Sequence, residues 1–408
     1  MRLLVITNLF HPDRGGGASV FSDLCFGLAE RGWSVTVFTT HPYYPEWRRK
    51  SDAPVWRRQR ERLRGVDVVR HGLHVPAQPS KLIPRVLFEA SFLASLARSL
   101  FAGPRFDAVM VYCPTLSSVA FAALRRWVWR EPVWLNVQDI PADAASASGI
   151  SRSRLFDRVA QWGQRWLFNQ AQVWSTISPI MARRLAELRR RNQPLHVIPN
   201  WLNESMAAAV EASSARVRRL PGAPFRLLYA GNIGKKQGLL DTLQALQRSS
   251  AAIQVDVHGD GGEAAGVRAW IESVGDARFR FGPFLDEAGF VAALHRADAF
   301  LISERPGSGA SFIPSKLIPG IATGTPIVAV CDGDGPLGVE MRDHRLGLVT
   351  DWSGLEGLAD RVVELGRDGT GFIELQRQCL ERAKAYHRRY ALDGIAAKLG
   401  EVIAGVRA

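Results

Sequence analysis

The sequence has few cysteines, and none is placed as a metal ligand or redox pair. Only four occur in 408 residues, far apart and without a CxxC pair: Cys25, Cys113, Cys331 and Cys379. This spacing does not outline a zinc site or a disulfide framework, so we expect four free, buried thiols. The nine histidines are also scattered, with neither an HxH nor an HExxH spacing. The sequence therefore predicts no metal site.

Long hydrophobic runs and low-complexity tracts are also missing. The first apolar run ends at His11-Pro12-Asp13, too early for a signal peptide and far too early to cross a bilayer. We therefore expect a cytoplasmic protein. The composition, 47% hydrophobic and 22% charged, is typical of a globular protein. Because 408 residues exceed the usual size of a single core, two domains are expected.

The net charge of +13 is confined to one half of the chain. Residues 1–204 contain 28 Lys and Arg against 15 Asp and Glu, whereas residues 205–408 contain 24 of each. This asymmetry indicates an anionic partner for the first half, either nucleic acid or a phospholipid surface. No known nucleic-acid module is present, which favours the membrane. Alternatively, the positive charge reflects a general preference for arginine. That preference does not explain why the net charge is confined to residues 1–204.

Short apolar runs without polar alternation recur along the chain and predict strands buried on both faces. In the first half they are Leu3–Thr7, Val35–Thr39, Ala108–Tyr112, Val133–Val137, Val173–Ile177 and His196–Ile198. In the second half they are Phe225–Ala230, Ile253–His258, Phe279–Phe281, Ala299–Ser303, Ile327–Val330 and Leu346–Val349. Helical segments separate them. We predict two doubly wound, Rossmann-like α/β domains, 1–204 and 205–408, facing an interdomain cleft.

Glycine-rich and cationic loops follow several predicted strands. The first, Asp13–Ala18, brings Gly16 and Gly17 to the start of a helix, where backbone N–H groups suit a phosphate. A glycine-rich turn without a ligand is the alternative. It is not a dinucleotide fingerprint, because GxGxxG is absent. In the second domain, the candidate residues for binding an anionic ligand such as a diphosphate are Asn232, Lys235, Lys236, Gly259, Asp260, Ser315 and Lys316. Ser315 is expected at the N-cap or first turn of a helix that ends at Gly324.

These motifs together resemble the family 4 retaining glycosyltransferases of the GT-B fold. Arg31–Val37 resembles that family's GHEVTV strand, and Ile198-Pro199-Asn200 its IPN turn. Gly231–Gly238 resembles its donor-phosphate loop, and His258–Gly261 its GDG turn. The resemblance covers nearly the whole chain. Pro42–Trp47, Val137–Asp139 and Pro314–Leu317 are similar to the WcaI-type branch, associated with colanic acid and related exopolysaccharides.

The resemblance implies a nucleotide-diphosphate sugar as donor, with a fucose-like sugar, and a polyprenyl-diphosphate-linked glycan as acceptor. It implies Lys236, Lys235 and Lys316 at the diphosphate, Asp139 near the acceptor or the charged sugar, and Glu304 at donor hydroxyls. The family's E-x7-E pair is absent, because Ser311 and Pro319 stand at its positions. The alternatives are a GT-B nucleotide-sugar epimerase or hydrolase, and a noncatalytic membrane-bound scaffold.

The first domain is expected to bind the acceptor and to dock peripherally on the inner face of the cytoplasmic membrane. Its basic runs include Arg57–Arg64 and Arg125–Arg130, the second interleaved with tryptophan. Residues 82–101 are either part of this surface or an ordinary buried helix. The last helix of the second domain could pack back on the first domain.

Transfer is predicted to be metal-independent, since lysines rather than a divalent ion would neutralise the diphosphate. Activity should therefore survive EDTA. The measurement is the transfer rate with EDTA, magnesium or manganese, and loss with EDTA followed by recovery with a divalent ion would contradict the prediction.

Overall fold

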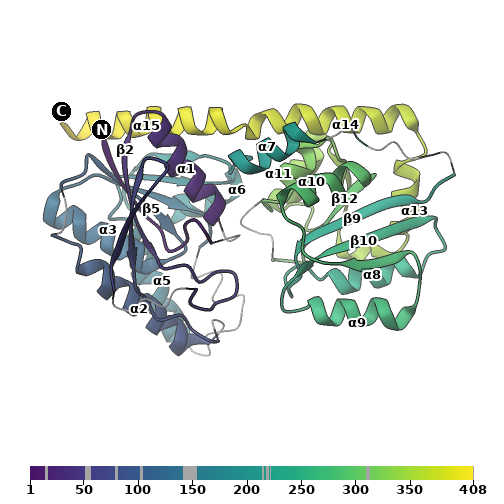
Figure 1. Cartoon of the computed structure of the whole chain (residues 1–408), viewed down its shortest axis with the longest axis horizontal. Helices are drawn as coiled ribbons and strands as arrows, with labels where there is room; N and C mark the ends of the chain where they lie inside the picture. Colours follow the sequence, from purple (N-terminus) through teal and green to yellow (C-terminus); the bar gives the residue numbers. More distant parts are fainter. Residues whose placement is uncertain are drawn as a thin grey trace. The chain divides into compact units, whose positions relative to one another are not determined.

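The computed structural model describes residues 1–13, 17–50, 57–78, 81–101, 104–140, 154–213, 216, 220, 222–308 and 313–407. The chain forms two compact units, one of Met1–Pro199 with Arg389–Ala408 and one of Asn200–Arg388 (Figure 1). The division lies five residues before the predicted boundary after residue 204. Helix α7 (Glu204–Ala212) packs on helices of the second unit, and the amide of Leu202 donates to the carbonyl of Tyr386 at 3.0 Å. These contacts draw residues 200–204 into the second unit.

The sheet of unit 1 has the strand order β3-β4-β2-β1-β5-β6-β7-β8. Its strands are β1 (Arg2–Ile6), β2 (Ser34–Thr40), β3 (Gln59–Leu63), β4 (Val66–His71), β5 (Ala108–Cys113), β6 (Val133–Val137), β7 (Val173–Thr176) and β8 (Leu195–Val197). All neighbours are parallel except β3 and β4. The six predicted strands are confirmed, but the sequence did not predict the β3–β4 hairpin.

Strand β3 is the edge of this sheet and carries part of the basic run that was read as a membrane contact. Arg60, Arg62 and Arg64 are exposed, and Arg64 forms a 3.0 Å ion pair with Glu30. Charged side chains on an edge strand hinder pairing with another chain. This run therefore has a structural reason that does not require a membrane.

The helices of unit 1 are α1 (Ala18–Glu30), α2 (Leu82–Ala97), α3 (Leu116–Trp129), α5 (Arg154–Phe168), α6 (Pro179–Leu188) and most of α15 (Arg388–Arg407). In α1, Phe21, Leu24 and Leu28 lie on one buried face at helical spacing. Gly17 caps this helix with φ 92°, and a Cβ there would lie 2.6 Å from the Phe21 ring. Gly17 is thus required by packing, whatever ligand it meets.

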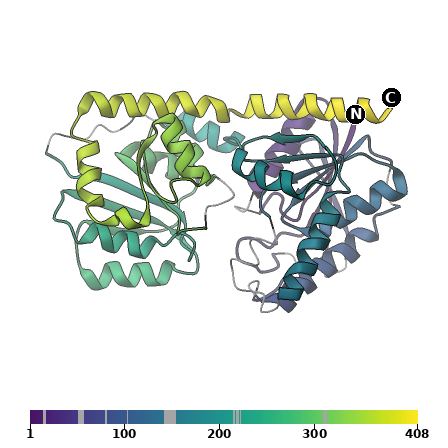
Figure 2. The same ribbon diagram turned by 180° about the vertical axis from the view of Figure 1, so that it is seen from behind.

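The sheet of unit 2 is fully parallel, in the order β11-β10-β9-β12-β13-β14. Its strands are β9 (Phe225–Asn232), β10 (Ile253–Asp260), β11 (Phe279–Gly282), β12 (Ala299–Ser303), β13 (Ile327–Val330) and β14 (Gly347–Thr350). Helices cover both faces of the sheet, as Figure 2 shows from behind. The predicted pair of doubly wound α/β units is therefore confirmed.

Two apolar cores sandwich this second sheet. Leu227 and Tyr229 of β9 point into one core, and Leu228 and Ala230 point into the other, as alternate strand residues must. The first core receives α8 (Leu239–Gln247), α9 (Ala264–Val274) and α13 (Leu358–Leu365). The second receives α10 (Glu287–Arg296), α11 (Leu317–Ala322), α12 (Pro336–His344) and α14 (Gly369–Ala383).

A fully buried ion pair fixes one end of unit 1. Arg125 in α3 donates to both carboxylate oxygens of Glu131, at 2.6 and 2.7 Å, and also to the carbonyl of Leu100 at 3.2 Å. The amide of Phe106 donates to the same carboxylate at 2.8 Å. This network joins the end of α3 to the segment that follows α2.

Replacement of Arg125 by leucine should lower the free energy of unfolding by about 3–5 kcal/mol, because it leaves the Glu131 carboxylate buried without its partner. The measurement is urea unfolding followed by tryptophan fluorescence. Arg367→Leu is the matched control, since Arg367 and Glu364 form an exposed 2.6 Å pair and its loss should cost less than about 1 kcal/mol. Equal effects of the two substitutions would contradict the argument.

Candidate active site

The loops after the parallel strands of unit 2 meet at one edge of the sheet and are tied together by backbone hydrogen bonds. The amide of Arg305, after β12, donates to the carbonyl of Lys236, after β9, at 2.7 Å. The amide of Ile233 donates to the carbonyl of Asp260 at 2.8 Å. The indole N–H of Trp352 donates to the Glu304 carbonyl at 2.6 Å. The loops predicted to bind the donor therefore share one framework.

Gly259 allows two of these loops to approach closely. A Cβ at this position would lie 2.1 Å from the carbonyl oxygen of Gly231, so no side chain fits there. Asp260, the next residue, is exposed, and its carboxylate accepts from the Gly261 amide at 2.7 Å. The GDG turn is thereby held against the loop after β9.

Glu304 is a buried carboxyl group at the carboxyl end of β12. Only 6% of the residue is exposed, and its amide donates to the Val330 carbonyl at 2.8 Å. Burial raises the pKa of the Glu304 carboxyl to about 7, and the positive charges of Lys316 and Lys236 oppose this rise only in part. Glu304 can therefore exchange a proton near neutral pH.

Lys316 directs its ammonium group into the same region. Its Nζ lies 4.2 Å from the centre of the Tyr229 ring and is closed to solvent, although the residue as a whole is half-buried. Within the described residues this Nζ has no hydrogen-bond partner. Burial lowers the pKa of Lys316 to about 8, with Glu304 pulling the other way. A buried cation without an acceptor indicates a place for an anionic ligand.

Ser315 does not cap the helix that follows it, so this part of the prediction is wrong. Helix α11 has Lys316 at its N-cap, and Ser315 precedes it as an exposed residue. The amide of Leu317 donates to the carbonyl of Pro314 at 3.0 Å, which delays the helix by one position. The helix ends at Ala322, two residues before Gly324.

The loop after β9 presents three exposed polar residues, Asn232, Lys235 and Lys236. Gln237 organises this loop, because its Oε1 accepts from Asn232 Nδ2 at 3.2 Å and from the Gly234 amide at 3.1 Å. The predicted donor residues of the second domain thus lie at the ends of the parallel strands and in the segments that follow them.

A pocket of about 440 Å³ opens beside this loop at the beginnings of α8 and α9. Lys235, Arg305, Asp241 and Glu263 contribute charged groups to its wall. Arg305 pairs with Asp241 and lies 5.7 Å from the Trp352 ring. The sequence did not assign Arg305 or Asp241 to the site, although Arg305 directly follows Glu304.

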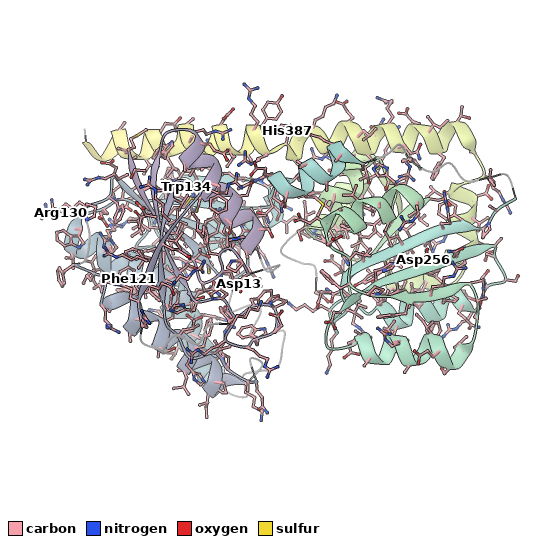
Figure 3. The ribbon with its side chains drawn as sticks, viewed as in Figure 1. Asp13, Phe121, Arg130, Trp134, Asp256 and His387 are labelled. Atoms are coloured by element: carbon pink, nitrogen blue, oxygen red, sulfur yellow. The ribbon has the colours of Figure 1, made fainter. Side chains whose placement is uncertain are left out.

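Unit 1 carries a separate polar cluster where β1, β2 and β5 end. The buried carboxylate of Asp13 accepts from the amides of Tyr43 and Tyr44, both at 2.9 Å (Figure 3). Asn8 donates to the Tyr43 hydroxyl at 2.7 Å and accepts from the Thr115 hydroxyl at 2.5 Å. Burial raises the pKa of Asp13, although the two amides pull it downward. The sequence did not predict this cluster, because its residues come from loops that are far apart along the chain.

Asp139 lies in unit 1, two residues beyond the end of β6. It is half-buried, and its Oδ1 accepts from the Ile140 amide at 2.9 Å. Its charge helps to raise the pKa of the buried Cys113 thiol at the end of β5. Asp139 is therefore at the carboxyl edge of the sheet, as predicted. Gly16 lies outside the described residues, and Gly17 caps α1.

Two sequence comparisons show similarity to glycosyltransferases. Residues 15–201 match the model of the glycosyl transferase 4-like domain. A protein of Escherichia coli (strain K12), provisionally assigned as the colanic acid biosynthesis glycosyl transferase WcaI, is 29% identical over 349 residues, 83% of this chain and 85% of the relative. Residues 15–201 thus match a glycosyl transferase 4-like domain, and the chain is similar to WcaI over most of its length. The WcaI-like resemblance expected from the motifs is confirmed.

Solved structures show that the chain has the GT-B fold. A sucrose-phosphate synthase of Thermosynechococcus elongatus aligns with a TM-score of 0.70 at 17% identity, over 99% of this chain and 100% of its own. HepE of Anabaena, in complex with UDP and glucose, aligns with a TM-score of 0.66 at 16% identity, over 98% and 100%. WaaG, involved in lipopolysaccharide biosynthesis, aligns with a TM-score of 0.61 at 13% identity, over 96% and 98%.

Three features of the described part of the chain concern its cysteines, metal binding and membrane spans. All four cysteines are buried and free, as predicted. No group of three or more His, Cys, Asp or Glu side chains there could hold a metal ion. No helix in the described residues combines the length and the apolar character that crossing a membrane requires.

Glu304→Gln should change how the stability of the ligand-free protein depends on pH. Because the folded pKa is about 7 against an ordinary 4.5, the folded state holds the proton more tightly, so wild-type stability should fall as pH rises through this window. Glutamine cannot titrate, and the variant should lack a decline on the order of 3 kcal/mol. Urea midpoints across this pH range measure it.

Glu356→Gln, at an exposed position, is the control and should show the same pH slope as the wild type. Parallel slopes for wild type and Glu304→Gln would rule out a raised Glu304 pKa.

Proposed function

We propose that the protein moves a sugar, with retention of configuration, from a nucleotide-diphosphate sugar to a polyprenyl-diphosphate-linked glycan during exopolysaccharide synthesis. The observation that carries this proposal is the buried Lys316 ammonium, which has no hydrogen-bond acceptor among the described residues and lies beside the loops that carry Lys236 and Glu304. A nucleoside diphosphate supplies the anionic oxygens that such a site needs.

The donor diphosphate would be bound by Lys236, Lys235 and Lys316. The remaining predicted residues of unit 2 would line the donor site: Asn232, Gly259, Asp260 and Ser315. The complex of HepE with UDP and glucose is a GT-B precedent for a nucleotide and a sugar in one protein of this fold. The sequence likeness to WcaI supports a cell-surface polysaccharide as the product.

The catalytic contribution of these residues would be electrostatic. As the bond between sugar and diphosphate lengthens, negative charge grows on the leaving phosphate and positive charge grows on the sugar. The Lys236 and Lys316 ammonium groups would stabilise the phosphate, and neither needs a divalent ion to do so. A bound diphosphate would also raise the lowered pKa of Lys316, which keeps that group charged when it is needed.

Glu304 would contact hydroxyl groups of the donor, either as a carboxylate acceptor or as a neutral acid, since its pKa lies near 7. Asp139 would orient the acceptor or stabilise the charged sugar from unit 1. A lipid-linked acceptor would also require a peripheral position of unit 1 on the inner face of the cytoplasmic membrane.

A thermal-shift panel of UDP, GDP and their sugars, with GDP-fucose included, tests the donor class. A ligand that binds only the folded state must raise the melting temperature. Transfer is then followed with the stabilising donor and a polyprenyl-diphosphate-linked glycan. A new lipid-linked product supports the proposal, whereas donor hydrolysis or epimerisation that ignores the acceptor contradicts it.

Lys236→Ala should weaken binding of the nucleoside diphosphate by roughly 1.5–3 kcal/mol, about 10- to 150-fold, because one charge-assisted contact is lost. The rate of transfer should fall as well, with no change in melting temperature without ligand. Calorimetric titration measures the affinity. Lys384→Ala is the control, since Lys384 is exposed and pairs with Glu381 at 2.6 Å. Equal affinity in the Lys236 variant and the wild type would refute the assignment.

A further inference from the structure

The exposed apolar side chains of unit 1 gather on three neighbouring helices. Helix α3 packs against both α2 and α5, and both ribbon views show α2 and α5 side by side (Figures 1 and 2). The large apolar side chains exposed on these helices and at the end of α2 form what we call the apolar face: Ile83, Val86, Leu87, Phe101, Trp127, Val128, Val159 and Trp162. Elsewhere in the described part of unit 1, the exposed large hydrophobic residues are only Met1, Val197 and Tyr390.

Helix α2 is apolar on two sides. Phe88, Phe92 and Leu96 are buried in the unit, as expected for a surface helix. The outer side has a second stripe, in which Ile83, Val86, Leu87, Ala90, Ala94 and Ala97 recur every three or four residues and are exposed. A helix that only covers a core would carry polar residues there. The outer stripe therefore needs a partner of its own.

Ring contacts connect the three helices beneath this surface. The rings of Trp127 and Trp166 lie 5.5 Å apart, and those of Phe101 and Trp129 lie 5.9 Å apart. The indole N–H of Trp129 also donates to the Leu100 carbonyl at 2.8 Å. The apolar face is therefore a preformed surface.

Cations surround the apolar face. The exposed charged residues beside it are all basic: Lys81, Arg98, Arg105, Arg130 and Arg158. Figure 3 shows Arg130 at the margin of unit 1. In the described segments 81–101, 104–106, 116–130 and 158–168, no acidic side chain is exposed. Glu89, the one acidic residue of these segments, is half-buried and accepts from the amide and hydroxyl of Ser117 at 2.9 and 2.6 Å.

We propose that the apolar face docks on an anionic phospholipid bilayer, with α2 lying in the plane of the headgroups. Exposed apolar groups, indoles and a rim of cations, with no exposed carboxylate in the described segments named above, together complement such a surface. A second copy of the chain is a poor occupant, because a symmetric contact would place the same cations against one another. The biological purpose of this docking rests on the proposed lipid-linked acceptor. The binding experiment itself requires neither donor nor acceptor.

The test is co-sedimentation of the full chain with vesicles of phosphatidylcholine alone and of equal parts phosphatidylcholine and phosphatidylglycerol, without donor or acceptor. We expect binding to the anionic vesicles that weakens with salt. Arg130→Gln with Arg158→Gln should weaken it about 25-fold, at about 5-fold per cation. The charge-matched control is Arg60→Gln with Arg62→Gln on β3, which should bind almost as the wild type does.

The apolar contribution is tested with Ile83→Ser and Trp162→Ser together, which should weaken binding by roughly 10-fold or more. Ile373→Ser in α14, which is 62% exposed in unit 2, is the control. Circular dichroism and melting temperature verify that each variant is folded.

Three results would each overturn the proposal: equal binding to both vesicle types, equal weakening by the two arginine pairs, or unchanged binding of the double serine variant. A dimer in solution that the double serine variant disrupts would assign the face to a second copy instead. Transfer to a detergent-solubilised acceptor is measured separately, so a failure of docking is distinguishable from a failure of the proposed activity.

Discussion

Taking the Lys316 ammonium out of water costs free energy, and no hydrogen bond within the described residues offsets that cost. The face of Tyr229 at 4.2 Å and the nearby Glu304 compensate only in part, since the pKa values of Lys316 and Glu304 both move toward the neutral forms. Burial of Lys316 therefore lowers the free energy of unfolding of the ligand-free unit. An anionic ligand that completes the site should stabilise the whole unit.

The loops around this group are held in place by backbone contacts. The bond from the Arg305 amide to the Lys236 carbonyl, and the bond from the Trp352 indole to Glu304, fix the loops in position. The close approach at Gly259 does the same for the GDG turn. Such a framework lets the lysines meet a ligand without first reorganising the backbone, which is what electrostatic catalysis requires.

Much of the fold could be predicted because strands buried on both faces leave a strong apolar pattern. The β3–β4 hairpin was missed for the opposite reason, since β3 is an exposed, charged edge strand whose residues resemble a solvated loop. The donor loops were predicted from their residue types. The electrostatic interaction of Glu304 with Lys316, and the hydrogen bond between Asn8 and Thr115 across more than one hundred residues, could not be predicted, because only the folded chain brings these groups together. The sequence also could not predict which side chains of α2 are exposed. Both sides of this helix are apolar, and only the folded structure shows which side packs against the core.

The chain leaves unit 1 at Pro199 and returns to it at Arg389. Within α15, Leu392, Ile395, Leu399 and Ile403 are buried, and Asp393 pairs with Arg31 at 2.8 Å. Unit 1 is thus completed by a segment that the ribosome makes only after all of unit 2. At ordinary rates of synthesis, the intervening residues take on the order of 10–40 s to produce. During that time the surface later covered by α15 stays exposed, and transiently exposed apolar surface favours aggregation.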